Sequence, residues 1–376
     1  MSSLDINANP ETSGVGILPA QTLRQMISDG CIYSAEEIND ELIQPASLDM
    51  RLGEVAWRVQ SSFLPGIDAT VEDKVTNLGM HRIDITNGAV LEKGCVYIVQ
   101  LLESLRLPEH ISGFANPKSS TGRLDIFTRV ISNSGTRFDL IRAGYDGPLY
   151  AEVSPKTFSI AVRTGSRLSQ LRLRNGRAEV TPDELMDLQE KFCLIDAPVD
   201  PVELREHNSL NLRLDLSSKG IVGGRARQHT GVIDIDRPNF YEPEDFWEPV
   251  LARKECVILN PDDFYILATR EAVTVPPGLA AEMVAYDTLV GEFRVHYAGF
   301  FDPGFGWSNT NAEVGSRGVL EVRSHDVPFL LEHEQIIGRL RYERLAAQPT
   351  KIYGTDIGSN YQGQGLRLSK QFKFEA

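Results

Sequence analysis

The sequence has few cysteines and none of the common metal or phosphate signatures. No H-x-E and P-C-x-x-C pair is present, which argues against the zinc enzymes that use these motifs to activate water. Walker, G-x-S-x-G and G-x-G-x-x-G loops are also missing. A disulfide framework is not expected either, because the chain is long and its four cysteines lie far apart, at Cys31, Cys95, Cys193 and Cys256. Any chemistry must come from a different arrangement, without zinc or another dedicated metal site.

Long apolar runs and an excess of positive charge are lacking as well. No stretch approaches the roughly 18 apolar residues of a transmembrane helix, and residues 1–14 are too polar for a secretory signal. The net charge of −14 fits poorly with a general binder of DNA or RNA. We therefore expect a cytoplasmic protein with no membrane or nucleic-acid polymer as partner, and a flexible N-terminal tail at 1–16. A negative exterior would oppose entry of a polyphosphate, so a pocket for one needs its own cations.

Short strand-like segments dominate what is present. Many short strands at close spacing favour a mainly β fold, either a sandwich, a barrel or a jelly-roll. Helices are expected at 22–30 and at 181–192, where Thr181, Pro182 and Glu184 provide a capping box and a first-turn proline. The clearest strand segments, separated by Gly, Pro, Asn and Asp, are 96–102, 158–163, 264–270 and 318–323.

The two halves of the chain repeat each other in the same order. We interpret this long-period similarity as duplication of one β domain. The matching segments are 47–53 with 209–215, 96–115 with 264–283, and 147–173 with 318–343. The expected units are repeat 1 at 17–195, repeat 2 at 196–346 and a C-terminal tail at 347–376.

Three segments could carry chemistry. KSSTGR at 118–123 combines cations, hydroxyls and a glycine turn suited to phosphate groups, although any surface turn can contain such residues. HYAGFFDPGFGW at 296–307 could pack a flat base and present Asp302 to a hydroxyl, or could be an ordinary Asp-Pro-Gly turn. Glu321 lies in an apolar strand, where it is either functional or directed to solvent on the polar face.

Taken together, these segments resemble the dCTP deaminases, relatives of the trimeric dUTPases, in their long bacterial two-repeat form. QPASLDMRL at 44–52 is similar to the family's Q-P-S-S-x-D-x-R-L strand, and KSSTGR is similar to its phosphate motif R-S-S-x-x-R, with Lys118 replacing the first Arg. HYAGFFDPGFG is similar to the base-and-sugar motif, and GVLEV places Glu321 at the catalytic glutamate position. The tail is similar to the family's nucleotide-closing segment, with a usual Lys replaced by Asn360 and matching spacing at Tyr353, Tyr361, Gln362 and Gln364.

The resemblance implies two tandem dUTPase-like distorted β-barrel or jelly-roll domains with a few short helices, and one hybrid site. Repeat 1 has Arg142 where the sugar-binding Asp would stand, whereas the phosphate turn of repeat 2, at 285–292, lacks the Ser pair and the Arg. Glu152, the repeat 1 copy of the glutamate, is the runner-up catalytic acid, and Glu313 in the insertion at 307–317 is a rival. The hybrid site would combine Lys118, Ser119, Ser120 and Arg123 of repeat 1 with Ala298, Asp302 and Glu321 of repeat 2.

The activity implied by the resemblance is hydrolytic deamination of dCTP to dUTP and ammonia, which supplies dUTP for dUMP and dTTP synthesis. Glu321 would be the general base, with Ser119 and Arg123 positioning the water, and Mg²⁺ would arrive on the triphosphate. A homo-oligomer is expected, with a homotrimer favoured and dTTP as a feedback ligand. The alternatives are a dUTP diphosphatase, a bifunctional dCTP deaminase and dUTPase, and a non-catalytic dNTP-binding regulator.

Overall fold

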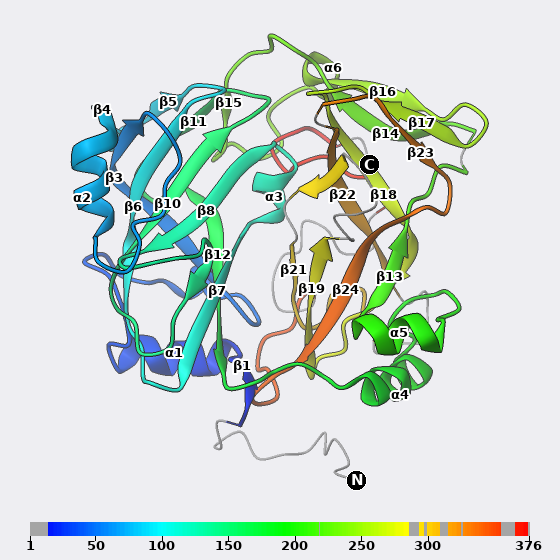
Figure 1. The fold of residues 1–376 in the computed structure, drawn as a ribbon, viewed down its shortest axis with the longest axis horizontal. Helices are drawn as coiled ribbons and strands as arrows, with labels where there is room; N and C mark the ends of the chain where they lie inside the picture. Colours follow the sequence, from blue (N-terminus) through cyan, green and yellow to red (C-terminus); the bar gives the residue numbers. More distant parts are fainter. Residues whose placement is uncertain are drawn as a thin grey trace.

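The computed structural model describes residues 14–217, 219–285, 293–296, 299–308, 315–324, 326–354 and 365–374. The fold is mainly β, as expected from the strand-like segments. Figure 1 shows two β-rich halves side by side, the first coloured blue to green and the second green to orange. Within the described ranges, no helix is long and apolar enough to cross a membrane.

The first half folds mainly into one large antiparallel sheet that curls into a barrel-like shape. Its elements are β1 (Gly16–Ile17), α1 (Ala20–Ser28), β2 (Ile32–Tyr33), a 3₁₀ turn (Asp40–Leu42), β3 (Leu48–Val59), α2 (Val71–Leu78), β4 (Gly79–Asp84), β5 (Ala89–Leu91), β6 (Val96–Arg106), β7 (Ile111–Pro117), α3 (Ser119–Gly122), β8 (Ile126–Ser132), β9 (Leu140–Ile141), β10 (Asp146–Pro155), β11 (Ile160–Val162) and β12 (Arg167–Asn175). The sheet runs in the order β8-β10-β6-β3-β12-β7-β9, with β1 beside β12, β2 beside β6 and β4 beside β3.

The second half distributes its strands over smaller sheets. Its elements are α4 (Pro182–Phe192), α5 (Pro201–His207), β13 (Leu210–Arg213), β14 (Ile221–Ala226), β15 (Ile233–Asp234), α6 (Pro243–Phe246), β16 (Trp247–Leu251), β17 (Cys256–Leu259), β18 (Phe264–Val273), β19 (Leu279–Ala285), β20 (Phe293–His296), β21 (Phe300–Phe301), β22 (Ser316–Ser324), β23 (Phe329–Glu332) and β24 (Ile336–Arg344). Two sheets of this half run in the orders β13-β24-β19-β21 and β16-β14-β18-β22-β20, and β17 pairs with β23.

The same buried ion pair occurs in both halves at matching sequence positions. In the first half, Glu103 of β6 accepts hydrogen bonds from the Arg51 backbone N–H at 2.8 Å and from its Nε at 2.7 Å. In the second half, Glu271 of β18 accepts the same two bonds from Arg213, at 2.6 and 2.7 Å. Because a buried carboxylate is stable only when it is paired and hydrogen-bonded, this arrangement is a structural requirement of each copy. The duplication predicted from the sequence therefore extends to side-chain contacts.

Helix α4 starts with the predicted capping box and packs in the second half. The Glu184 N–H donates to the Thr181 hydroxyl at 3.4 Å, and the Glu184 carboxylate accepts from the Thr181 N–H at 2.9 Å. Leu185 and Leu188 belong to the second hydrophobic cluster, together with Leu204 of α5. The core of the second half therefore begins near residue 180, whereas the predicted domain limit at residue 195 stays a prediction.

The two halves are joined through strand pairing and ion pairs. β15 of the second half adds in parallel to β11 of the first. Arg163 in the first half pairs with Asp234 at 2.6 Å and with Asp236 at 2.9 Å. Phe246 and Trp247 of the second half complete the hydrophobic cluster of the first. The halves therefore pack as one unit.

Candidate functional site at the junction of the repeats

The predicted phosphate loop, residues 118–123, links β7 to β8 and forms the single helical turn α3. The Lys118 N–H donates to the Leu168 carbonyl at 2.9 Å, which holds the start of the loop against β12. The Arg123 N–H donates to the Ser119 carbonyl at 3.0 Å and closes the turn. Neighbouring strands therefore fix the loop before any ligand arrives, and Figure 1 shows α3 facing the second half.

Glu321 lies across the junction from this loop. It occupies the middle of β22, opposite Ile266 of β18, and its residue is only 6% exposed. Burial raises the pKa of Glu321 to about 8, the positive charge of Arg123 opposes this rise, and the negative charge of Asp125 adds to it. Arg123 and Glu321 are thus close enough to influence each other electrostatically. A single chain brings together the cationic loop of repeat 1 and the carboxyl of repeat 2.

A second contact across the junction holds the loop and the glutamate strand together. Arg323 follows Glu321 by two residues in β22, and its guanidinium pairs with the Asp125 carboxylate and donates to the Thr157 hydroxyl at 2.9 Å. The Thr157 hydroxyl in turn donates to Asp125 at 2.6 Å. Asp125 has a φ of 56°, so the chain turns sharply immediately after the loop. This buried network fixes the loop relative to β22.

Asp302, the predicted sugar-binding residue, is held by an arginine from the other repeat. The Arg172 guanidinium of β12 lies 3.4 Å from the Asp302 carboxylate, donates to the Ala281 carbonyl at 3.1 Å and stacks 4.0 Å over the Phe300 ring. Burial raises the pKa of Asp302, and the positive charges of Arg172 and Lys118 oppose the rise. Asp302 is therefore within electrostatic range of the phosphate loop, on its Lys118 side.

Tyr353 packs on the base-and-sugar turn. Its N–H donates to the Pro303 carbonyl at 2.9 Å, and its ring centre lies 5.8 Å from that of Phe305. The described part of the predicted closing segment is therefore already in contact with that turn. The remaining predicted contacts, namely Ala298, Tyr361, Gln362, Gln364 and the rival acid Glu313, lie outside the described residues.

Glu152, the runner-up acid, sits in a structural ion pair. Its Oε1 accepts from Arg129 Nη2 at 2.6 Å and from Nε at 3.2 Å, and its residue is 1% exposed. The Arg129 guanidinium also stacks 3.5 Å over the Phe138 ring. A carboxylate neutralised in this way is poorly suited to exchange protons with a substrate. Its surroundings favour Glu321 as the reactive acid.

The end of the C-terminal tail docks on the phosphate loop. Arg123 Nη1 donates to the Arg367 carbonyl at 2.9 Å, and the Ser369 hydroxyl donates to the Ser120 carbonyl at 2.7 Å. Phe372 anchors this segment, with its ring centre 6.0 Å from that of Trp247. The tail therefore returns to the first repeat and forms part of the loop's surroundings.

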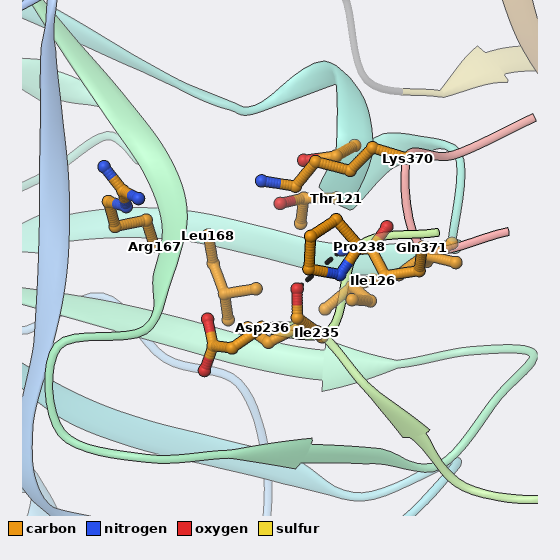
Figure 2. A pocket seen from close by; sticks show the side chains of 11 residues that line it. Thr121, Ile126, Arg167, Leu168, Ile235, Asp236, Pro238, Lys370 and Gln371 are labelled. Atoms are coloured by element: carbon orange, nitrogen blue, oxygen red, sulfur yellow. Dashed lines mark hydrogen bonds between the residues drawn. The ribbon is translucent and has the colours of Figure 1, made fainter. Parts of the chain in front are cut away.

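A cavity of about 210 Å³ lies beside the loop, under the returning tail. Ser120 and Thr121 form one wall, and Arg167 of β12 and Lys370 of the tail contribute cations, as Figure 2 shows. Asp236 lines another side. The loop therefore borders two regions, with the Glu321 carboxyl on one side and a cation-lined cavity on the other.

Four basic residues of the site were not singled out from the sequence. The arginines lie in strands, and the segment 167–175, RLSQLRLRN, has three arginines of its own, so nothing local distinguishes Arg172. Nothing local distinguishes the lysine, because its position depends on a contact between residues 249 apart in the chain. The four are Arg167, Arg172, Arg323 and Lys370.

A dedicated metal site is not evident in the parts of the chain that the structure describes. Those parts contain no group of three or more His, Cys, Asp or Glu side chains placed to hold a metal ion. Asp49 faces the loop, but it is engaged by Lys118 and lies 3.8 Å from Arg167. Two expectations stay predictions: that Mg²⁺ arrives bound to the triphosphate, and that the protein uses no zinc.

The fold and the junction define a duplicated β protein with a buried carboxyl facing a cationic loop. Two family models cover almost the whole chain. The 2'-deoxycytidine 5'-triphosphate deaminase N-terminal domain matches residues 14–177, and the C-terminal domain of the same family matches 181–372. The chain belongs to the 2'-deoxycytidine 5'-triphosphate deaminase family.

Individual relatives agree with this assignment. A crystal structure of 2'-deoxycytidine 5'-triphosphate deaminase from Agrobacterium tumefaciens is 51% identical, has a TM-score of 0.83, and covers 88% of this chain and 99% of its own. The dCTP deaminase, dUMP-forming, of Parafrankia sp. is 32% identical over 47% of this chain and 84% of its own. The dCTP deaminase of Haloarcula marismortui is 28% identical over 40% of this chain and 76% of its own. These two shorter relatives each match about half of the duplicated chain.

Proposed function

We propose that this protein is an enzyme that hydrolyses dCTP to dUTP and ammonia at the junction of its two repeats. The observation that carries the proposal is the buried Glu321 carboxyl, which is close enough to Arg123 of the other repeat for the two to influence each other electrostatically. The names of the similar proteins, which are dCTP deaminases and dUMP-forming dCTP deaminases, support the choice of substrate.

Glu321 would move the protons of the reaction. Water adds to C4 of cytosine, one proton of the water passes through the carboxyl to N3, and the C4–N bond then breaks so that ammonia leaves with a second proton. A general acid and base works best when its pKa lies near the working pH, and burial raises the pKa of Glu321 to about 8. The products, dUTP and ammonia, balance dCTP and one water.

The loop and the turn would hold the nucleotide. Ser119 and Arg123 would position the water and stabilise the charge that develops on the ring. Lys118 and Ser120 would bind phosphate oxygens, and Asp302, oriented by Arg172, would accept from the deoxyribose hydroxyl. Backbone groups near Ala298 would read the base, and the closing segment would contribute Tyr353, Tyr361, Gln362 and Gln364. Mg²⁺ would neutralise the triphosphate as it binds.

Further expectations about the protein belong with this proposal. The dUTP formed would supply dUMP and dTTP synthesis in the cytoplasm, with dTTP as a feedback ligand. The assembly would be a homotrimer. The units would be a tail at 1–16, repeats at 17–195 and 196–346, and a closing tail at 347–376.

Replacing the proposed base tests the proposal directly. Glu321→Gln keeps the size and the hydrogen-bonding capacity of the side chain but removes its proton transfer, so ammonia release from dCTP should fall by about 10²-fold or more, with dCTP binding largely retained. Glu152→Gln is the matched control in the other repeat and should leave measurable turnover of the same order as the unmodified protein. Ammonia release measures activity, and calorimetry measures dCTP binding. Full activity in Glu321→Gln would contradict the assignment.

The second candidate is a dUMP-forming enzyme, which would go on to cleave dUTP. It is favoured by relatives named dCTP deaminase, dUMP-forming, including that of Corynebacterium glutamicum strain R at 30% identity over 42% of this chain. Ion-exchange analysis of the product from dCTP separates the two, because dUMP lacks the pyrophosphate that dUTP retains. A non-catalytic regulator would turn over no deoxynucleotide at all.

A further inference from the structure

We propose that the cavity bordered by Ser120, Arg167 and Lys370 is a subsite for the terminal phosphates of a nucleoside triphosphate. Within it, Lys370 would distinguish a triphosphate from shorter nucleotides. This inference rests on the proposed function, because it assumes that the nucleotide lies along the loop at 118–123. It assigns a binding role to Lys370, a residue of the closing tail that is not among the matching positions Tyr353, Tyr361, Gln362 and Gln364.

The Lys370 ammonium is available to an anion. Figure 2 shows its side chain reaching over the cavity toward Arg167. Among the described residues, no hydrogen bond or ion pair of the Lys370 side chain is found. Burial lowers the pKa of Lys370, and the positive charges of Lys118 and Arg167 lower it further, while the negative charges of Asp49 and Asp236 oppose the change. An incoming phosphate would relieve this repulsion and favour the ammonium form.

The carboxylates around the cavity are already engaged by other cations. Asp236 lines the cavity, but its carboxylate accepts from Arg163 at 2.9 Å and from the Ser166 hydroxyl at 2.5 Å. Asp49 pairs with Lys118 and lies 3.8 Å from Arg167. These pairings offset part of the negative charge that would otherwise repel a phosphate.

The backbone holds Lys370 in place on both sides. The Ser369 hydroxyl donates to the Ser120 carbonyl at 2.7 Å, and the Asn239 N–H donates to the Lys370 carbonyl at 2.8 Å. Gln371 Nε2 donates to the Ile235 carbonyl at 2.6 Å. Because this backbone is already fixed, binding of a ligand to Lys370 requires no ordering of the main chain, which favours affinity.

The size and location of the cavity suit the end of a polyphosphate. Its volume of about 210 Å³ leaves room for a phosphoryl group with some of its water, since a water molecule occupies roughly 30 Å³ in the liquid. Ser120 and Thr121 belong both to the cavity wall and to the loop that reaches Glu321 through Arg123. A triphosphate chain leaving the reacting base along this loop would therefore reach the cavity.

Binding of inorganic tripolyphosphate tests the subsite without catalysis. Titration calorimetry on the full chain at about 0.15 M salt would compare the unmodified protein with K370M, K370R and K373M. Loss of one charge-assisted hydrogen bond typically weakens binding on the order of ten- to a hundredfold, which is the result expected for K370M. K370R should retain affinity within a few-fold. K373M, the matched control on the same segment, should bind as the unmodified protein does, because the exposed Lys373 pairs with Glu242 on the surface.

Three results would overturn the subsite: no binding of tripolyphosphate to the unmodified protein, unchanged affinity in K370M, or equal weakening in K373M. If K370M does not fold, R167M serves as the second variant with the same expected weakening. Ammonia assays separate the two proposals, since K370M should raise the KM for dCTP about tenfold or more while leaving that for dCMP unchanged. If the protein does not deaminate dCTP but still binds tripolyphosphate in a Lys370-dependent way, the proposed function is contradicted and the phosphate subsite is supported.

Discussion

Glu321, the proposed general base, occupies a buried position that is unfavourable for its ionised form. Ionising a carboxyl inside a protein is unfavourable unless a partner compensates for the lost hydration. Arg123 compensates only in part, and burial raises the pKa of Glu321 to about 8. Glu152 is equally buried but has Arg129 beside it. The two copies of one residue have therefore acquired different chemical environments.

The raised pKa of Glu321 predicts a pH-dependent stability difference. The unfolded chain ionises this group near pH 4.5, whereas the folded protein keeps its proton until about pH 8. The free energy of unfolding therefore falls between these values by roughly 5 kcal/mol at most. The Glu321→Gln variant has no such ionisation. The difference in thermal midpoint between this variant and the unmodified protein should therefore shift in favour of the variant as the pH is raised from 5 to 8.5. Calorimetry at both pH values checks this, and an offset independent of pH would contradict it.

The strand β22 combines two roles through its alternation. Residues two apart in a strand point to the same face, so Glu321 and Arg323 both face the first repeat. One approaches Arg123 and the other binds Asp125. A single β-strand thus supplies the proposed catalytic carboxyl and the contact that fixes the loop opposite it.

The docked C-terminal segment should depend on one aromatic anchor. Phe372 is 4% exposed and packs against Trp247 and Phe246, with ring centres 6.0 and 5.5 Å away. Phe372→Ala should lower the free energy of unfolding by about 3 kcal/mol, raise the KM for dCTP several-fold and expose the segment to proteases. The matched control is Phe374→Ala, because Phe374 is 57% exposed. Urea unfolding, limited proteolysis and the KM for dCTP are measured for both variants. Equal effects of Phe372→Ala and Phe374→Ala would contradict the anchoring role.

The regular elements were more predictable than the contacts between them. The helix at 181–192 and its capping box follow from local spacing, and the structure confirms both. The helix expected at 22–30 is found two residues earlier, as α1. The segment expected as a strand at 158–163 is shorter, β11, and pairs in parallel with β15 of the other half. That pairing joins distant segments, so local periodicity carries no signal for it.

The candidate site likewise contains some residues that the sequence predicts and others that it does not. Motif spacing identified Asp302 and Glu321, whose residue types are unusual in apolar segments. Arg172 and Lys370 reach the site through contacts across the junction. The other two tail lysines, Lys351 and Lys373, instead pair with Asp40 and Glu242. The contribution of Arg172 and Lys370 depends on how the halves pack, which only the folded chain specifies.

At the scale of the whole molecule, one chain contains both parts of the proposed site. Arg123 of the first repeat and Glu321 of the second are close enough to influence each other electrostatically within that chain. A mixture of Glu321→Gln chains and Arg123→Gln chains should therefore show no more ammonia release from dCTP than the sum of the two alone. Co-expression of differently tagged chains, followed by purification of the mixed oligomer, provides the sample. Recovery of a substantial fraction of normal activity would mean that the site is assembled from different chains.

The unequal repeats also restrict how this gene can change. The first repeat has bound its glutamate to Arg129, and the second has lost the serine pair and the arginine of its phosphate turn. A fragment carrying either repeat alone would contain half of the reacting groups. Under the proposed function, damage to either copy would therefore disable the whole chain, because neither copy could substitute for the other.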